Sequence, residues 1–385
     1  MARMTSEERI NTAIKLGKPD RVPVVPILDM FSSRYGGITQ HEMLFDLKKA
    51  DRALEKTIED LGAIDGMNLS YAGMGPMMSL IFLVPPMLPG IDGYPEDALW
   101  QFVEETVMEP EEYKDVVKKG GMRWMLGKLR EHNPIMASPS RLVKQMGKLI
   151  SFGLQFKRST RAWRKKDVVF LVGPNLSFTP MEWISLGLRS FTDYIMDLYR
   201  YPEDIQAVSK EFIKLFKPLG LILSRLSGIP RVFMGGTRTS ASAINPKQFE
   251  KFALPEWLEM CEYYVSKNIT PVLHLDSDWT PFLHYFKEFP RGKCVLNLDG
   301  VTDIFEAKKV LDGHMCIMGD VPATMLKLGQ PEEVEDYCRK LFREVGSDGG
   351  FILSSGCTVP VDSKPENVKA MLQSVHRHGV YPIRG

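Results

Sequence analysis

Short apolar runs alternate with amphipathic stretches along most of this chain of 385 residues. The runs are bounded by Gly, Pro or Asp, which is typical of buried strands, and the stretches between them carry apolar residues at helical spacing. The predicted strands lie near Val22–Leu28, Ile64–Leu69, Val168–Val172, Arg231–Met234, Pro271–Leu275, Cys294–Leu298, Met315–Met318 and Phe351–Leu353. The predicted helices include Lys48–Leu61, Phe191–Tyr199, Glu203–Leu226, Pro246–Ser266, Thr280–Phe289, Ile304–Leu311 and Pro331–Val345. Eight strands that alternate with helices predict an α/β protein of the (β/α)8 TIM-barrel class, with residues 1–385 as a single barrel domain.

One connection is too long for a plain barrel. Residues of about 74–166, between predicted strands 2 and 3, are expected to form a helical cap insertion over the barrel mouth. The cap begins with clustered methionines, among them Met74 and Met77, which suit an adaptable apolar wall around a ligand but also ordinary packing. Residues 141–166 hold nine basic residues, no acidic residue and an apolar stripe. This stretch could contact an acidic partner or a membrane surface, or form a solvated helix face.

Polar or reactive residues follow every predicted strand. Active sites of such barrels lie at the C-terminal ends of the strands. The residues found there are Asp29, Asn68, Ser70, Asn175, Thr237, Arg238, His274, Asp276, Asp299, Asp320 and Cys357. Loops are generally polar, so part of this pattern is trivial, but we take Asn175, Arg238 and Asp320 as candidates for binding substrate or cofactor.

Composition narrows the classes of function. A net charge of +1 gives no reason to expect nucleic acid as a partner, and no run approaches the ~18 apolar residues of a membrane span. Thr5 and Glu8 fit a capping box that opens a helix, where a signal peptide would be apolar, so we expect a cytoplasmic protein. The five cysteines include no CxxC pair, which argues against a disulfide framework and a zinc ribbon.

The stretch from Pro271 to Trp279 carries the most specific chemistry. His274 and Asp276 follow each other at strand spacing and can project to the same side. Zinc accepts imidazole nitrogen, thiolate sulfur and carboxylate oxygen, and a catalytic zinc keeps one position open. His274 and Cys357, with Asp276 or Asp299 as the oxygen donor, would provide such a set. A histidine that caps a strand and acids that accept backbone amides are the structural alternatives.

Three stretches resemble the uroporphyrinogen decarboxylase superfamily, and within it the cobamide (corrinoid)-dependent methyltransferase branch. They are the opening Asp20-Arg21-Val-Pro-Val24, the helix boundary from Asp197 to Glu203, and the C-terminal stretch from Ser355 to Met371, which is the most specific. The resemblance implies a TIM barrel, in agreement with the strand count.

Departures from the family pattern separate its branches. The decarboxylases follow the first strand with two arginines that hold the substrate carboxylates, whereas this chain has Ile27–Ser33 there and only Arg34 nearby. The methyltransferases carry zinc on a His-x-Cys pair and a later cysteine, which match His274 and Cys357 but place Asp276 where a cysteine is expected. An oxygen ligand makes the site harder and suits an oxygen-bearing substrate such as a methyl ether or alcohol.

The sequence therefore supports a hypothesis of zinc-dependent methyl transfer between a small molecule and a corrinoid on a partner protein. We expect the metal on His274, Cys357 and Asp276 or Asp299, with the remaining acid managing the proton. One alternative is a decarboxylase-like lyase that uses Asp29, and another is a non-catalytic barrel that binds a tetrapyrrole or corrinoid. A homodimer is compatible with either.

Overall fold

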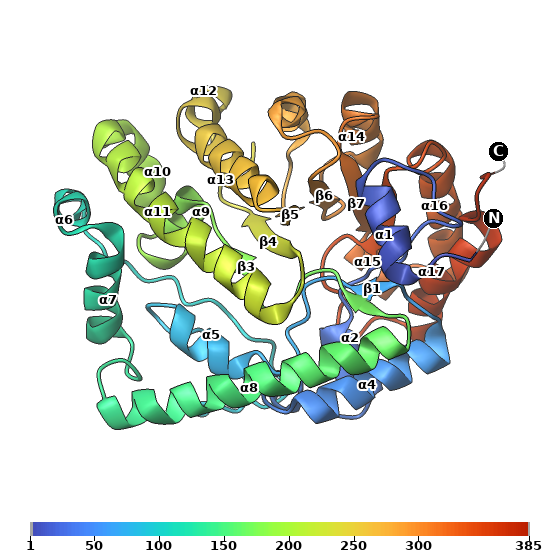
Figure 1. The fold of residues 1–385 in the computed structure, drawn as a ribbon, viewed down its shortest axis with the longest axis horizontal. Coiled ribbons are helices and arrows are strands. Elements are labelled where there is room, and N and C mark those ends of the chain that lie inside the picture. Colours follow the sequence, from blue (N-terminus) through green and yellow to red (C-terminus); the bar gives the residue numbers. More distant parts are fainter. Residues whose placement is uncertain (1–2, 384–385) are drawn as a thin grey trace.

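A ring of parallel strands forms the centre of the fold (Figure 1). The computed structural model describes residues 3–383. The strands are β1 (Gly66–Met67), β2 (Val169–Phe170), β3 (Leu176–Ser177), β4 (Arg231–Gly236), β5 (Thr270–Leu275), β6 (Val295–Leu298), β7 (Cys316–Val321) and β8 (Phe351–Ser355). Strands β3 to β8 pair in sequence order, and β1 pairs with β2. β2 and β3 lie on either side of Gly173 and Pro174. β2 pairs with β1 whereas β3 pairs with β4, so the two together occupy one strand position of the barrel, and each such position is called a stave below.

Residues 22–27 close the ring between β8 and β1. Parallel bridges join Val24 to Leu353 and Ile27 to Thr358 on one side. On the other side the amide of Asp65 donates to the carbonyl of Val24. This stave forms bridges instead of a continuous strand because Pro23 and Pro26 have no N–H to donate to a ladder. The predicted TIM barrel is confirmed, although β3 was not predicted from the sequence.

Helices surround the ring at most of its circumference (Figure 1). The α-helices that cover the barrel are α1 (Ser6–Ile14), α2 (Asp29–Tyr35), α3 (Gln40–Phe45), α4 (Leu47–Leu61), α9 (Pro180–Gly187), α10 (Phe191–Arg200), α11 (Pro202–Ser227), α12 (Pro246–Gln248), α13 (Leu254–Ser266), α14 (Ile304–Leu311), α15 (Ala323–Leu328), α16 (Pro331–Glu344) and α17 (Pro365–His378). The predicted helix Pro246–Ser266 is present but contains a π-helical turn, η1 (Phe249–Ala253), between α12 and α13. The predicted helix at Thr280 is the 3₁₀-helix η2 (Thr280–Glu288).

α1 plugs the N-terminal end of the barrel. Its predicted capping box is present, since the Thr5 side chain accepts from the Glu8 amide and Glu8 reaches back to the amide of Thr5. Ile10 and Ile14 of this helix belong to the same buried cluster as Val272 of β5, whose side chain lies inside the barrel. α1 thus fills the interior of the barrel at its N-terminal end, and active sites of such barrels lie at the opposite, C-terminal end of the strands.

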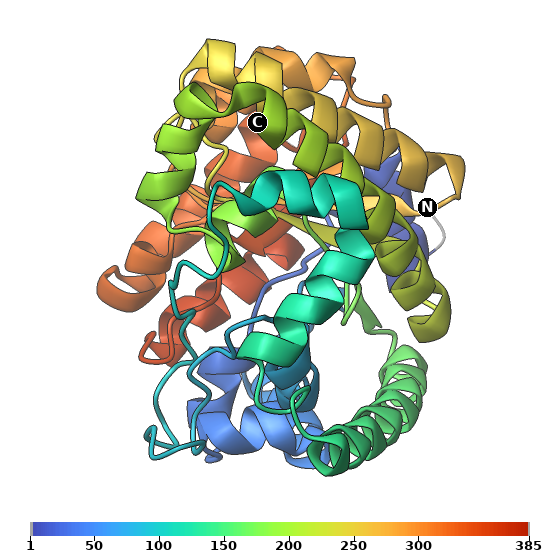
Figure 2. The ribbon, with the colours of Figure 1, turned by 90° about the vertical axis from the view of Figure 1, so that its left-hand side faces the viewer.

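The connection between the second and third staves is largely helical (Figure 2). It contains α5 (Gly75–Ile81), α6 (Glu112–Lys119), α7 (Gly121–His132) and α8 (Pro139–Lys165). α6 and α7 pack against α11, and α8 packs against α4 and α5. The outward face of α8 carries Val143 and Ile150, which are 73% and 63% exposed, among basic residues. The expectation of an acidic partner or a membrane surface for this helix stays a prediction. No helix within residues 3–383 is both long and apolar enough to cross a membrane.

Candidate metal centre

A cavity of about 410 Å³ opens at the C-terminal ends of the strands. Leu69 and Phe233, which belong to the inner core of the barrel, and Leu176, which packs against that core, form part of its lining. Residues of the long insertion, among them Phe82 and Trp100, line it as well. The cavity is thus shared by the barrel and the insertion.

His274, Asp276 and Cys357 meet at the wall of this cavity. The Nε2 atom of His274 lies 3.3 Å from Oδ1 of Asp276 and 3.6 Å from Sγ of Cys357. One ligand atom from each residue lies within 4.8 Å of the other two. A nitrogen, an oxygen and a sulfur donor converge, which is the number of protein ligands that a catalytic zinc site uses.

Strand geometry and one glycine produce this convergence. His274 lies near the end of β5, and Asp276 follows at the two-residue spacing that keeps side chains on one face. Cys357 approaches from the turn after β8. A Cβ atom at Gly356 would lie 2.1 Å from the carbonyl oxygen of Asp299, so only glycine permits the close approach of these two turns.

A buried amide fixes the orientation of the His274 ring. The Nδ1–H of His274 donates to Oδ1 of Asn297 at 2.7 Å, and Nδ2 of Asn68 donates to the same oxygen at 2.8 Å. Asn297 and Asn68 are both buried. With a proton held on Nδ1 toward Asn297, Nε2 is the ring nitrogen that faces Asp276 and Cys357, and partners of this kind orient metal-binding histidines generally. The donor set therefore fits a zinc ion.

His274 and Asp276 each stabilise the charged form of the other. Burial alone would lower the pKa of His274, but hydrogen bonds to Asp276 and Cys357 outweigh it, and the pKa lies well above its ordinary value. Burial opposes ionisation of Asp276, yet His274 holds the pKa of this carboxyl below its usual range. Without a metal the two groups form an ion pair. Because a metal requires neutral imidazole, metal binding would release the histidine proton.

Buried Glu182 positions the loop on which Asp276 depends. Its carboxylate accepts the amides of Thr237 and Thr239 at 3.0 and 2.8 Å. The hydroxyl of Thr237 in turn donates to Oδ2 of Asp276 at 3.1 Å. Glu182 thus acts on Asp276 through the loop after β4.

Other sequence-predicted acids lie outside this group. Asp299 accepts the amides of Ser277 and Val301, each at 2.8 Å, so both of its oxygens cap turns. Burial raises the pKa of Asp29 to about 6, and its carboxylate accepts from the hydroxyl of Ser70 at 3.3 Å.

Of the residues predicted to bind substrate or cofactor, some line the cavity and others do not. Burial raises the pKa of Asp320 to about 7, and this side chain accepts from the hydroxyl of Tyr337 at 2.8 Å. Asn175 is buried, with Nδ2 donating to the carbonyl of Arg231 at 2.9 Å, so it stabilises the junction between β3 and β4. Arg238 and Met74 line the cavity, whereas Met77 is buried without being among the lining residues.

Two parts of the site were not predicted from the sequence. Asn297 is a polar residue inside a predicted apolar strand, and that break in the pattern was an available signal. The aromatic lining from the insertion, including Phe82, Trp100 and Phe102, had no comparable signal because most of it lies in irregular backbone.

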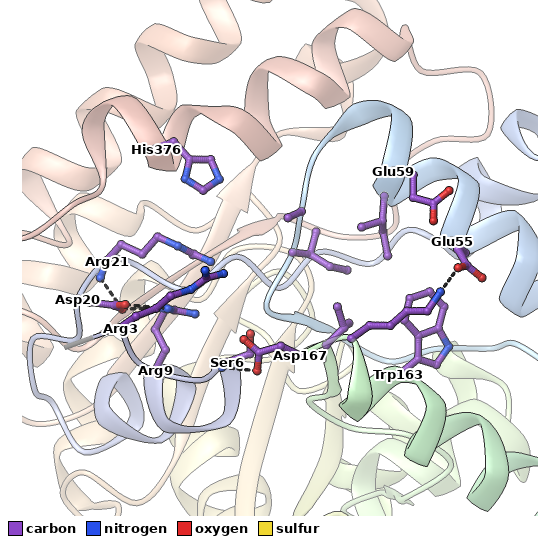
Figure 3. Close-up of a pocket in the computed structure, with 15 residues that line it drawn as sticks. Arg3, Ser6, Arg9, Asp20, Arg21, Glu55, Glu59, Trp163, Asp167 and His376 are labelled. Carbon is purple, nitrogen blue, oxygen red and sulfur yellow. Dashed lines mark hydrogen bonds and ion pairs between the residues drawn. The ribbon is translucent and has the colours of Figure 1, made fainter.

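A second cavity, of about 500 Å³, opens at the N-terminal end of the barrel (Figure 3). Arg9 pairs with Asp20 at 2.6 Å and also with Asp65, and Arg21 pairs with Asp65 at 2.6 Å. These charges stabilise one another, and the N-terminal face of such barrels generally serves stability. We therefore place the functional site at the other end.

Comparison with known proteins agrees with this architecture. A solved structure of a methyltransferase from Methanosarcina mazei superimposes with a TM-score of 0.68 at 16% sequence identity, and the match covers 97% of this chain and 99% of that one. This likeness concerns the fold.

Sequence relatives match over a shorter stretch. The uroporphyrinogen decarboxylases of Myxococcus xanthus and Geotalea daltonii are 28% and 27% identical over 139 residues, which are 36% of this chain. The matched part spans only 38% and 40% of those proteins. The family model for uroporphyrinogen decarboxylase (URO-D) matches residues 179–378, which is more than half of the chain and includes His274, Asp276 and Cys357. The chain belongs to the uroporphyrinogen decarboxylase family.

Proposed function

We propose that this protein is a zinc-dependent methyltransferase that moves a methyl group between a small molecule and a corrinoid carried by a separate protein. The convergence of His274, Asp276 and Cys357 at the cavity wall carries this proposal. The likeness of the fold to a methyltransferase supports it further. A zinc ion on these residues would act as a Lewis acid toward the heteroatom that bears the methyl group.

The protein side chains have separate tasks in this proposal. His274 offers Nε2 because Asn297 holds the proton on Nδ1. Asp276 offers one carboxylate oxygen while Thr237 donates to the other, which limits rotation of the carboxylate. Cys357 contributes sulfur after it loses its proton. The apolar lining of the cavity excludes water from the reacting atoms, and this strengthens the electrostatic interactions there.

The proton of the reaction requires a further acid or base. Asp276 is itself one of the three proposed metal ligands. Burial raises the pKa of Asp299, which is close enough to Asp276 and His274 for their charges to act on this pKa as well. We assign the proton to Asp299 as the acid outside the ligand set. Asp29, which is buried and is not among the residues that line the cavity, keeps a role only in the lyase alternative.

The cavity gives little support to decarboxylation of a tetrapyrrole that carries many carboxylates. Among the described residues that line it, Arg238 is the one lysine or arginine. Arg34 lines a different surface hollow. Carboxylates depend on charge-assisted hydrogen bonds for tight binding, and one guanidinium can serve only one or two of them.

Metal analysis and a methyl-transfer assay test the proposal. We expect about one zinc per chain in the wild type and in Asp299→Asn, and loss of zinc in His274→Ala and Cys357→Ala. Zinc-loaded protein should methylate cob(I)alamin, followed by absorbance, from a panel of methyl ethers, alcohols and thiols. Asp299→Asn should keep its metal and lose most of the rate. A protein that takes up no zinc on titration, or that transfers no methyl group from any donor when loaded, would contradict the proposal.

A further inference from the structure

The wall of the cavity is rich in aromatic rings. Six aromatic side chains line it, namely Tyr71, Phe82, Trp100, Phe102, Phe178 and Phe233. Four of them form a continuous series of ring contacts. The ring centroids of Tyr71 and Trp100 are 5.4 Å apart, those of Trp100 and Phe102 are 4.9 Å apart, and those of Phe102 and Phe82 are 5.2 Å apart. Edges and faces of aromatic rings attract a further ring beyond the effect of apolar area.

This aromatic wall extends to the candidate metal ligands. The ring of Phe233 lies 5.5 Å from that of His274, centroid to centroid. Most polar groups of the lining are already engaged, since Glu182 accepts the amides of the loop after β4 and Thr237 donates to Asp276. Arg238 faces Phe191, with its guanidinium 4.8 Å from the ring centroid. The remaining free surface therefore suits an apolar, flat ligand.

The size of the cavity points in the same direction. About 410 Å³ falls within the range of roughly 300–1,000 Å³ that is usual for small-molecule sites. A one-carbon alcohol would leave most of this volume unfilled and would make no contact with the ring series.

We propose that the small-molecule substrate is an aromatic methyl ether whose ring lies against Trp100, Phe102 and Phe82, and whose methoxy oxygen faces His274, Asp276 and Cys357. The methyl part of this inference rests on the proposed function, whereas the aromatic part rests on the cavity. In the reaction the bond between the methyl carbon and the ether oxygen breaks, and its electron pair stays on the oxygen. The cobalt(I) electron pair forms the new bond to the methyl carbon, so cobalt becomes formally cobalt(III). The phenolate then takes a proton.

The chemistry of the leaving group favours an aromatic ether. A phenol such as the tyrosine side chain has a pKa near 10, whereas the pKa of water, which resembles a simple alcohol, is far higher. A phenolate therefore leaves with far less stabilisation than an alkoxide requires. Such a substrate also suits the oxygen ligand that Asp276 supplies in place of a second thiolate.

Binding measurements on the full chain separate the ring from the methyl chemistry. We would titrate the zinc-loaded protein with anisole and with methoxycyclohexane, which has the same size and the same methoxy group but no aromatic face. We expect anisole to bind about two- to tenfold more tightly. In Phe102→Leu the preference should fall toward equal binding. Phe45→Leu, which removes a ring from a different hollow, is the matched control and should keep the preference.

The outcomes distinguish this inference from the proposed function. Thermal unfolding checks that both variant proteins are folded. Equal affinity of the wild-type protein for the two ethers would overturn the aromatic assignment. A methyl-transfer rate from methanol or methoxycyclohexane equal to that from anisole would overturn it as well. Tight, ring-selective binding without methyl transfer to cob(I)alamin would refute the proposed function and leave the aromatic ligand standing.

Discussion

Replacement of Asn297 by leucine should weaken zinc binding at the proposed site, although Asn297 is not itself a proposed ligand. The two side chains have similar size, so the change removes an acceptor without opening a large cavity. It deprives His274 Nδ1 and Asn68 Nδ2 of the shared oxygen that lies 2.7 and 2.8 Å from them. Once Nδ1 has no acceptor, the proton can occupy Nε2 and block the lone pair that the metal needs.

The expected magnitudes follow from these two contacts. A buried donor without a partner costs about 1–3 kcal/mol, so the free energy of unfolding should fall by about 2–6 kcal/mol. Loss of an orienting partner typically lowers metal affinity by about 10- to 100-fold, which corresponds to about 1.4–2.7 kcal/mol. Asn297→Asp keeps an acceptor oxygen and should restore most of the affinity.

Zinc affinity and stability need to be measured side by side. Competition with a chromophoric chelator gives the zinc Kd, and denaturant unfolding of the metal-free protein gives stability. Asn367→Leu is the matched control, because Nδ2 of Asn367 donates to three carbonyls outside the cavity, those of Met325, Leu326 and Gly329. It should lose stability and keep its zinc Kd. An Asn297→Leu protein with zinc affinity within twofold of wild type would refute the reasoning, and so would equal loss of affinity in both variants.

Three further predictions concern stability and reactivity. Burial raises the pKa of Glu256 to about 8 from about 4.5, so the folded state holds a proton that the unfolded state releases, and stability should fall as the pH rises from about 4.5 to 8. Glu256→Gln should flatten this dependence and raise the free energy of unfolding at pH 8 by about 2–4 kcal/mol in urea titrations; an unchanged slope would contradict the pKa. The Cβ atom of Gly356→Ala would lie 2.1 Å from the Asp299 carbonyl oxygen, so this variant should lose at least about 1–3 kcal/mol of stability in thermal unfolding and hold less zinc. The control Gly127→Ala, which has open space around it in α7, should gain about 0.5–1 kcal/mol of stability. Cys357 is partly exposed while the other four cysteines are buried, so a thiol reagent should label it first, and zinc should protect it; mass spectrometry that finds another cysteine labelled first would refute this.

The sequence pattern was most informative where a side chain that can bind metal follows a predicted strand. His274 and Cys357 could be singled out because strand ends of a barrel face one edge, and the structure brings their side chains together. The choice between Asp276 and Asp299 could not be made from residue type. It depends on the folded backbone, where the amides of Ser277 and Val301 donate to the two oxygens of Asp299, whereas Asp276 lies beside His274 and Cys357.

Residues in the insertion could not be assigned from sequence for a different reason. Trp100 and Phe102 lie in backbone without helical or strand periodicity, so no pattern tells which of their neighbours face the cavity. Their orientation depends on contacts with Tyr71 and Phe82, which are close to them only in the folded chain. The barrel itself was predictable because it repeats the same strand-and-helix unit.

The way in which the ring closes also sets the order of events during synthesis on the ribosome. Val24 and Ile27 pair with Leu353 and Thr358, and the first helix packs against β8. The first stave must therefore wait until about residue 358 has emerged before its second edge is covered. At about 5–20 residues per second this delay is roughly 20 to 70 seconds. During that time the apolar side chains of residues 22–28 depend on β1 or on a chaperone for shelter, and Pro23 and Pro26 reduce the number of amides that could pair with another chain.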